Sequence, residues 1–224
     1  VGVLSHSANK EYGNNIVDSI IHYLTIKGEY NPRVEKTFKP SVCNRLDRNT
    51  SGIIIGAKNY EALRIINSAI KKGDVHKYYK TIVKGRVKKE GLIEGYLSKN
   101  EKLNKVRVLD DNEDTAKRIL TKIKVLKAND KYSLLEIELI TGRTHQIRAH
   151  LSSIGHPVIG DVKYGDEKVN ELFRTKYGLE SQFLHAYKIE FSKLKPPLDY
   201  LEGRTFTAKP MDKFLRIEED LFGE

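Results

Sequence analysis

A carboxylate and a guanidinium stand two residues apart in a polar segment that leads into an apolar run. The segment reads Asn44-Arg45-Leu46-Asp47-Arg48-Asn49-Thr50-Ser51-Gly52, and Ile53-Ile54-Ile55 follows it. In an extended backbone, Arg45 and Asp47 share one face and Leu46 points to the other. The neighbouring cation then favours an ionised Asp47 that is held in place. A simpler interpretation, which these residues alone favour, is a loop ion pair with Asn49 and Thr50 in a turn.

A second polar stretch opens a predicted helix. It reads Thr141-Gly142-Arg143-Thr144-His145-Gln146-Ile147-Arg148-Ala149-His150, and Leu151 follows. Arg148 is one helical turn from Thr144 and His145, so these residues share a face distinct from the Ile147 and Leu151 stripe. A cationic helix start suits contacts with phosphate or carboxylate groups. An ordinary solvated helix face explains the same pattern equally well.

A third stretch places tyrosines among lysines, in His76-Lys77-Tyr78-Tyr79-Lys80-Thr81-Ile82-Val83-Lys84-Gly85. Adjacent residues of a strand point to opposite faces, so one of Tyr78 and Tyr79 can be core while the other faces a cleft. Aromatic rings between cations suit the stacking of bases beside phosphates. A simpler interpretation, which the stretch alone favours, is an ordinary strand.

Composition narrows the classes of function. Lysine and arginine number 40 against 30 aspartates and glutamates, for a net charge of +10 and a pI near 9.4. This excess favours a polyanionic partner such as nucleic acid, although many basic proteins bind none. Cys43 is the single cysteine, which excludes an internal disulfide and cysteine-rich zinc sites and favours a reducing cytoplasm. His145 and His150 miss the spacing of paired helical metal ligands, and no glycine-rich nucleotide loop is present, so we expect neither a metal nor a cofactor.

Local patterns predict an α+β fold with a mixed, largely antiparallel sheet flanked by helices. Predicted helices cover 15–24, 60–72 and 144–154, and predicted strands cover 52–56, 81–83, 105–108, 119–125, 134–140, 185–191 and 204–208. We expect one domain over 1–224. Because the chain starts at Val1 inside a strand-like run, we expect it to be a fragment that lacks an N-terminal part. No apolar run approaches the roughly 20 residues that a membrane span needs.

Together the three stretches resemble the RluA family of pseudouridine synthases. The family patterns H-R-L-D-x-x-T-S-G, K-x-Y-x-A-x-V-x-G and T-G-R-T-H-Q-I-R-x-H correspond in order to 44–52, 77–85 and 141–150. The run Gly155-His156-Pro157-Val158-Ile159-Gly160-Asp161 extends the third match, and the resemblance covers nearly the whole chain. Asn44 stands in place of the usual histidine and Thr81 in place of the usual alanine.

The resemblance implies that the chain isomerises uridine in RNA, a reaction that needs no cofactor. It implies that Asp47 is the catalytic carboxylate, whether it attacks the sugar, attacks the base or removes a ribose proton. It implies further that Arg148 pairs with Asp47 and that Tyr79 stacks on the target uracil. Arg45 would fill the gap left by the flipped nucleotide, and Arg143 would contact phosphates. A basic run is a second candidate for phosphate contacts, and it consists of Lys84, Arg86, Lys88 and Lys89.

The resemblance also implies a cytoplasmic enzyme, which we expect to be a monomer, acting on ribosomal RNA of the large subunit. Transfer RNA is the second candidate substrate. An RNA-binding S4 domain precedes this domain in many relatives, and the sequence cannot show whether one precedes it here. Two alternatives stay open: an RNA-binding module that has lost catalysis, and a metal-dependent nuclease suggested only by basicity and histidines.

Overall fold

The structure, a computed structural model, describes residues 2–3, 5, 15–100, 105–109 and 116–223. The chain divides into two compact units. One unit comprises Val1–His76 with Ile189–Thr207, and the other comprises Lys77–Lys188 with Ala208–Glu224. That these units form a single domain stays a prediction.

Two capped helices shape the first unit. Helix α1 (Ile16–Ile26) begins after Asn15, whose side chain accepts the Asp18 N–H, and it ends two residues beyond the predicted range. Helix α2 (Tyr60–Lys72) has the predicted bounds. Asn59 caps its start by accepting the Ala62 N–H at 2.8 Å, and Gly73 ends it in the left-handed conformation with φ 85°. Local capping residues therefore determine where α2 begins and ends.

The core of the first unit forms along α2. Its buried members are Ile65, Ile66, Ala69, Val75, Ile189, Phe191 and Leu194. Short strands β1 (Ser41–Val42) and β3 (Gly56–Ala57) pair antiparallel. The unit also contains β2 (Ser51–Gly52), a 3₁₀ turn η1 (Asp199–Leu201) and β10 (Thr205–Thr207). The predicted strand over 52–56 is wrong, because residues 53–55 lie between β2 and β3 outside any strand and are only partly buried.

An antiparallel sheet forms the centre of the second unit. Its strands are β4 (Val75–Lys84), β5 (Gly91–Asn100), β6 (Lys105–Leu109), β7 (Lys117–Ala128), β8 (Tyr132–Leu139) and β9 (Leu184–Phe191). They are ordered β9-β4-β8-β7-β5-β6, and each neighbouring pair from β4 to β6 is antiparallel. Val75 and His76 of β4 and the last three residues of β9 belong to the first unit. The predicted α+β class with a largely antiparallel sheet is confirmed, whereas β5 was not predicted.

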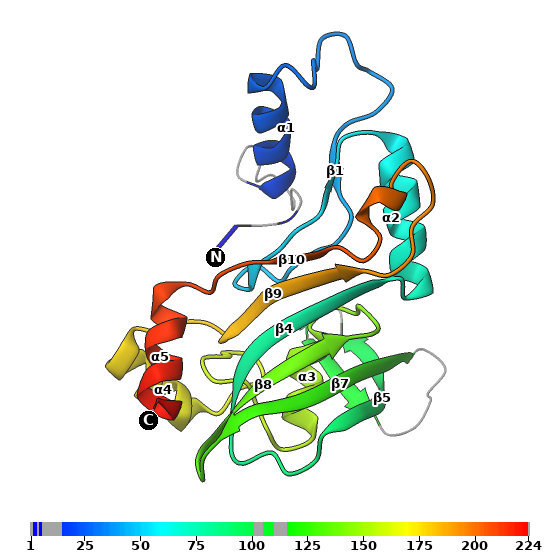
Figure 1. Ribbon diagram of the computed structural model, residues 1–224. Coiled ribbons are helices and arrows are strands. Elements are labelled where there is room, and N and C mark those ends of the chain that lie inside the picture. The colour runs from blue at the N-terminus through cyan, green and yellow to red at the C-terminus, as the bar shows by residue number, and fades with distance from the viewer. Residues whose placement is uncertain (1, 4, 6–14, 101–104, 110–115, 224) are drawn as a thin grey trace. The chain divides into compact units, whose positions relative to one another are not determined.

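Three described helices complete the second unit. Helix α3 (Gln146–Ser153) contacts β6 and β7, while α4 (Glu167–Tyr177) and α5 (Asp212–Phe222) lie side by side (Figure 1). Lys213 Nζ, on α5, donates to the Gly178 carbonyl at the end of α4 at 2.6 Å. Helix α3 buries every residue from Gln146 to Leu151, so the interpretation of this stretch as a solvated helix face is wrong. No helix among the described residues is long and apolar enough to cross a membrane.

Candidate active site

Asp47 lies in the first unit, in the loop between β1 and β2. Its carbonyl oxygen accepts the Thr50 N–H at 2.8 Å, which closes a turn over the two residues between them. The turn proposed as the simpler interpretation of this segment therefore exists. Asp47 is partly buried, whereas Arg45, two residues earlier, is exposed. The gap-filling role of Arg45 stays a prediction.

The residues on both sides of Asp47 are tied to the N-terminal segment. The Ser5 hydroxyl accepts the Leu46 N–H and lies in reach of the Leu46 carbonyl, both at 3.3 Å. The Gly2 N–H donates to the Arg48 carbonyl at 2.9 Å, and Arg48 Nε donates back to the Gly2 carbonyl at 3.1 Å. The backbone is thus fixed immediately before and immediately after Asp47, which restricts where its carboxylate can point.

Asn44, which stands where the family pattern has histidine, connects the loop to the backbone of residues 53–55. Its Oδ1 accepts the Ile55 N–H at 2.8 Å, and its Nδ2 lies 3.3 Å from the Ile53 carbonyl as donor. The Cys43 N–H donates to the Ile55 carbonyl at 2.8 Å. A side-chain amide therefore satisfies backbone groups that a neighbouring strand would otherwise pair. This explains why the apolar run over 53–55 is ordered without being a strand.

Tyr79 lies in the second unit, on the buried face of β4. Lys77, Tyr79 and Thr81 alternate with the half-buried Tyr78 and Lys80. Tyr79 is paired across the sheet with Ile137 and keeps 5% of its surface exposed. Tyr78 faces the other side, where Lys188 Nζ lies 3.9 Å from the centre of its ring. A uracil can stack on Tyr79 only after the ring has been uncovered.

Arg148 forms a buried two-pronged ion pair with Asp161. Its Nε and Nη2 donate to the two carboxylate oxygens at 2.6 Å and 2.8 Å, and Asp161 is fully buried. The same carboxylate accepts the N–H groups of Lys163 and Tyr164 at 2.9 Å and 3.1 Å. A guanidinium has five N–H donors, and this pair uses two of them. The predicted pairing of Arg148 with Asp47 would join residues of different units and stays a prediction.

Tyr164 and His145 support Arg148 from another side. The guanidinium carbon of Arg148 lies 5.3 Å from the centre of the Tyr164 ring. The Tyr164 hydroxyl accepts the Val106 N–H at 2.9 Å and lies 2.9 Å from His145 Nδ1. Among the described residues other than glycine, His145 alone has a positive φ, at 54°. Such a conformation costs about 1–3 kcal/mol and persists only where the surroundings enforce it, as they do at functional sites.

Gln146 anchors the loop that carries Arg143. Its Oε1 accepts the Thr141 hydroxyl at 2.8 Å and the Arg143 N–H at 3.1 Å. Its Nε2 donates to the Leu120 carbonyl at 3.0 Å. The backbone at Arg143 is therefore fixed, and Arg143 itself is exposed. Its contact with phosphate stays a prediction.

Sequence reasoning gave no role to Asp161, Tyr164, His145 or Gln146. All four occur in or directly after the third family motif, so their position was a usable signal. Their roles depend on tertiary contacts, such as the pairing of Arg148 with a carboxylate thirteen residues later.

Comparison with known proteins decides the family. The family model described as RNA pseudouridylate synthase matches residues 2–153, more than half of the chain. The chain belongs to the RNA pseudouridylate synthase family. It is 32% identical over 193 residues to the ribosomal large subunit pseudouridine synthase D of Borreliella burgdorferi, covering 84% of this chain and 55% of that protein. It is 36% identical over 149 residues to the synthase C of Vibrio cholerae, covering 66% and 46%.

Solved structures agree on the fold. Human RNA pseudouridylate synthase domain containing 4 superposes with a TM-score of 0.74 at 20% identity, covering 98% of this chain and 86% of that one. Its counterpart, human domain containing 1, gives a TM-score of 0.57 at 24% identity, covering 87% and 85%. The predicted pseudouridine synthase fold is therefore confirmed. The chain spans about half the length of the curated relatives that it matches.

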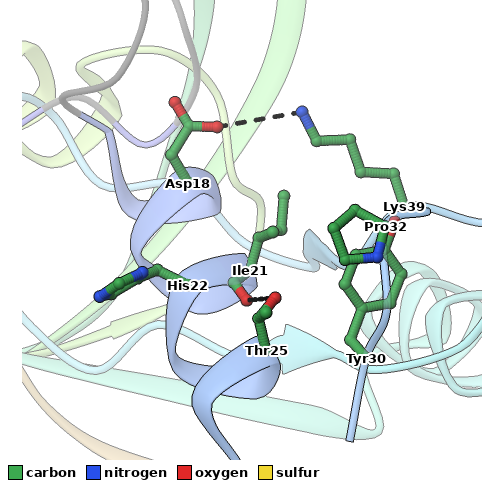
Figure 2. A pocket seen from close by; sticks show the side chains of 7 residues that line it. All are labelled: Asp18, Ile21, His22, Thr25, Tyr30, Pro32 and Lys39. Atoms are coloured by element: carbon green, nitrogen blue, oxygen red, sulfur yellow. Dashed lines mark hydrogen bonds and ion pairs between the residues drawn. The ribbon is translucent and has the colours of Figure 1, made fainter. Parts of the chain in front are cut away.

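Among the described residues, neither a metal-binding cluster nor the hollow beside α1 adds to the predicted site. Within the part of the chain that the structure describes, histidine, cysteine, aspartate and glutamate form no group of three or more that could hold a metal ion. A hollow beside α1 is shown in Figure 2, where Asp18 and Lys39 face each other at 3.9 Å. Its lining consists of Asp18, Ile21, His22, Thr25, Tyr30, Pro32 and Lys39. None of the predicted site residues lines it.

Proposed function

We propose that this chain isomerises uridine to pseudouridine in RNA and that Asp47 is the catalytic carboxylate. Large-subunit ribosomal RNA is the proposed substrate, and transfer RNA is the second candidate. Family membership supports the reaction, and the printed names of the relatives from Borreliella burgdorferi and Vibrio cholerae support the substrate. The observation that carries the assignment of Asp47 is the loop held on both sides of this residue by Gly2 and Ser5.

The reaction exchanges one bond for another within a single nucleotide. The C1′–N1 bond breaks and its electron pair stays with the base. The uracil then turns and C5 bonds to C1′. C5 releases its proton and N1 takes up a proton. Reactant and product contain the same atoms, so no redox partner or energy source is required. Asp47 can serve as nucleophile toward the sugar, nucleophile toward the base, or base toward a ribose proton.

The other site residues have separate roles in the proposal. The target nucleotide must leave its stack to be reached, which costs a few kcal/mol. Stacking on Tyr79 and filling of the gap by Arg45 would offset that cost, and Arg143 would contact phosphates. Arg148 would pair with Asp47 and keep it ionised, with Asp161 fixing the guanidinium from its other side.

Tritium release from RNA labelled at uracil C5 tests the proposal, because C5 loses its hydrogen only when the new bond forms. Transcripts of large-subunit ribosomal RNA and of transfer RNA are incubated with the wild-type chain, with Asp47→Asn and with Asp130→Asn, whose carboxylate is exposed. We expect release by the wild type and by Asp130→Asn, and none by Asp47→Asn. Release by Asp47→Asn at the wild-type rate would remove Asp47 from the chemistry.

The two alternatives give different results in the same experiment. A silent RNA-binding module would retain RNA without releasing tritium, and a longer chain that spans the length of the relatives would be equally inactive. A metal-dependent nuclease would shorten the RNA and stop in excess chelator. Unaltered RNA length with full tritium release in chelator excludes the nuclease.

A further inference from the structure

Lys77 is a buried lysine on the same strand face as Tyr79. The two residues are two positions apart on β4, which separates their backbones by about 6.6 Å. Lys77 keeps 7% of its surface exposed, and burial lowers the pKa of its ammonium. Its Nζ lies under the loop that carries Arg143, 3.8 Å from where a side chain on Gly142 would begin. The ammonium is thus placed between the tyrosine proposed to stack on uracil and the loop proposed to contact RNA.

Lys77 has no neutralising partner in the part of the chain that the structure describes. Among the residues that the structure describes, neither an ion pair nor a hydrogen bond of the Lys77 side chain is found. Arg148, the other buried cation of this unit, has Asp161 as its partner. Buried charges in proteins are normally paired, because desolvation of an unpaired ion is unfavourable. Among the described residues, the fully covered side-chain polar atom without a partner is Tyr177 Oη and not Lys77 Nζ. The ammonium therefore reaches the surface at the end of a buried stem, where it is open to a negative charge that arrives from outside.

The proposed reaction generates such a charge. In each of the three roles open to Asp47, the electron pair of the C1′–N1 bond remains with the base, and negative charge spreads onto the carbonyl oxygens of the uracil. The attraction between a preorganised cation and those oxygens is stronger in a water-poor site than in solution. The depth of Lys77 favours the base as its target over the phosphate chain, since the flipped base is the part of the RNA that enters the protein.

We propose that Lys77 is a catalytic residue that binds a carbonyl oxygen of the target uracil and stabilises its negative charge while the glycosidic bond is broken. This inference rests on the proposed function. The proposal assigns to Lys77 a contact that strengthens as charge develops. It therefore affects the rate of the bound complex more than the affinity for RNA.

The test compares Lys77→Met, Lys77→Arg and wild type in single-turnover tritium release from large-subunit ribosomal RNA labelled at uracil C5. Enzyme concentration is varied to separate the maximal rate from the half-saturating concentration. The series is repeated at several salt concentrations to measure how binding depends on salt. We expect Lys77→Met to lower the maximal rate about 100-fold, the size seen on removing one preorganised donor. We expect its half-saturating concentration to change less than about threefold, and Lys77→Arg to recover part of the rate because it keeps the charge. Lys80→Met is the control, since Lys80 lies on the opposite face beside Glu218.

Other outcomes overturn the inference. Lys77 would be a phosphate contact if Lys77→Met bound RNA more weakly but kept its maximal rate at saturation. The slope of log binding constant against log salt concentration would then be smaller in magnitude by about 0.7 to 1. Unchanged rate and affinity would make it a lysine that only reaches solvent. If Lys77→Met does not fold, Lys77→Gln replaces it, and an unchanged rate in that variant overturns the inference equally. Absence of tritium release from the wild-type chain and also from a longer chain that spans the length of the relatives would refute the proposed function itself, which is a separate result.

Discussion

We predict that breaking the buried ion pair of Arg148 and Asp161 destabilises the folded chain strongly. Asp161→Asn keeps the shape of the side chain and removes its charge. The guanidinium of Arg148 then stays buried opposite a neutral amide, which can accept hydrogen bonds through one oxygen only. The two N–H groups of Lys163 and Tyr164 compete with Arg148 for that oxygen.

The size of the effect follows from this geometry. Removing one partner of a buried ion pair costs about 3–5 kcal/mol, because the remaining charge is left without compensation. Asp161 is fully buried and only 6% of the Arg148 surface is exposed, so water can replace few of the lost interactions with the guanidinium. For a chain of this size, each kcal/mol lowers Tm by about 2–4 °C, so we expect a decrease of roughly 10 °C.

Urea denaturation followed by circular dichroism, together with thermal melts, measures the change. The double variant Arg148→Met with Asp161→Asn should be more stable than Asp161→Asn alone, because no charge then remains buried. Glu171→Gln breaks the exposed pair of Glu171 and Arg174 and serves as the control, with no measurable change in Tm expected.

A decrease in unfolding free energy below about 1 kcal/mol for Asp161→Asn would refute this reasoning. It would mean that Arg148 is stabilised by other groups and that Asp161 does not determine its position. A double variant less stable than Asp161→Asn would contradict the desolvation argument in the same way.

Four further predictions concern single residues. Tyr79→Phe should keep most tritium release, since the ring face that stacks is retained, whereas Tyr79→Leu should lose the stacking energy of about 1–3 kcal/mol; equal rates would contradict stacking. Arg148→Lys should lower release about 100-fold, because one ammonium cannot reproduce the two-pronged contact with Asp161, and wild-type turnover would show that this contact does not matter. Burial lowers the pKa of His150 below its ordinary 6.5, so the unfolded chain binds the extra proton first as pH falls. Stability should therefore fall below about pH 6.5, by up to about 1.4 kcal/mol per pH unit, until the folded His150 also titrates. Burial lowers the pKa of His185 in the same direction, so His150→Gln should reduce this slope in urea melts between pH 7 and 5 without abolishing it. Burial raises the pKa of Cys43 to about 11, so its alkylation at pH 8 should be about 100-fold slower in the native chain than in urea, as mass spectrometry can measure.

Local signals explain where sequence reasoning was accurate. Asn59 and Gly73 fix the two ends of α2 through side-chain and backbone bonds within the helix itself, so the sequence contains the information. Asp166 and Gly178 flank α4 in the same manner, and this helix could have been predicted from them. Helix α5 has no capping side chain at Met211, and an eleven-residue helix depends on packing such as the stacked Phe183 and Phe214.

Tertiary contacts explain where sequence reasoning failed. The apolar run of three isoleucines has the composition of a strand, but Asn44 occupies the hydrogen bonds that a strand partner would make. In the site, the motifs pointed to Asp47, Tyr79 and Arg148, whose roles stay predictions. They included Asp161 but could not show that it pairs with Arg148, because which carboxylate meets a buried arginine is decided by how α3 and the following loop pack.

Among the described residues of the second unit, Arg148 and Lys77 are both buried, but they differ in whether they have an acidic partner. Arg148 has a carboxylate of its own, so its charge is compensated before any substrate arrives, and removing Asp161 should destabilise the chain. Lys77 has no such partner among the described residues, so Lys77→Met should leave the unfolding free energy unchanged or raise it, while release of tritium falls. A lysine kept for structural reasons would give the reverse result, a loss of stability with normal turnover in the fraction that folds. Melting curves and single-turnover rates measured on the same two variants therefore separate a cation that holds the site together from one that acts on the substrate.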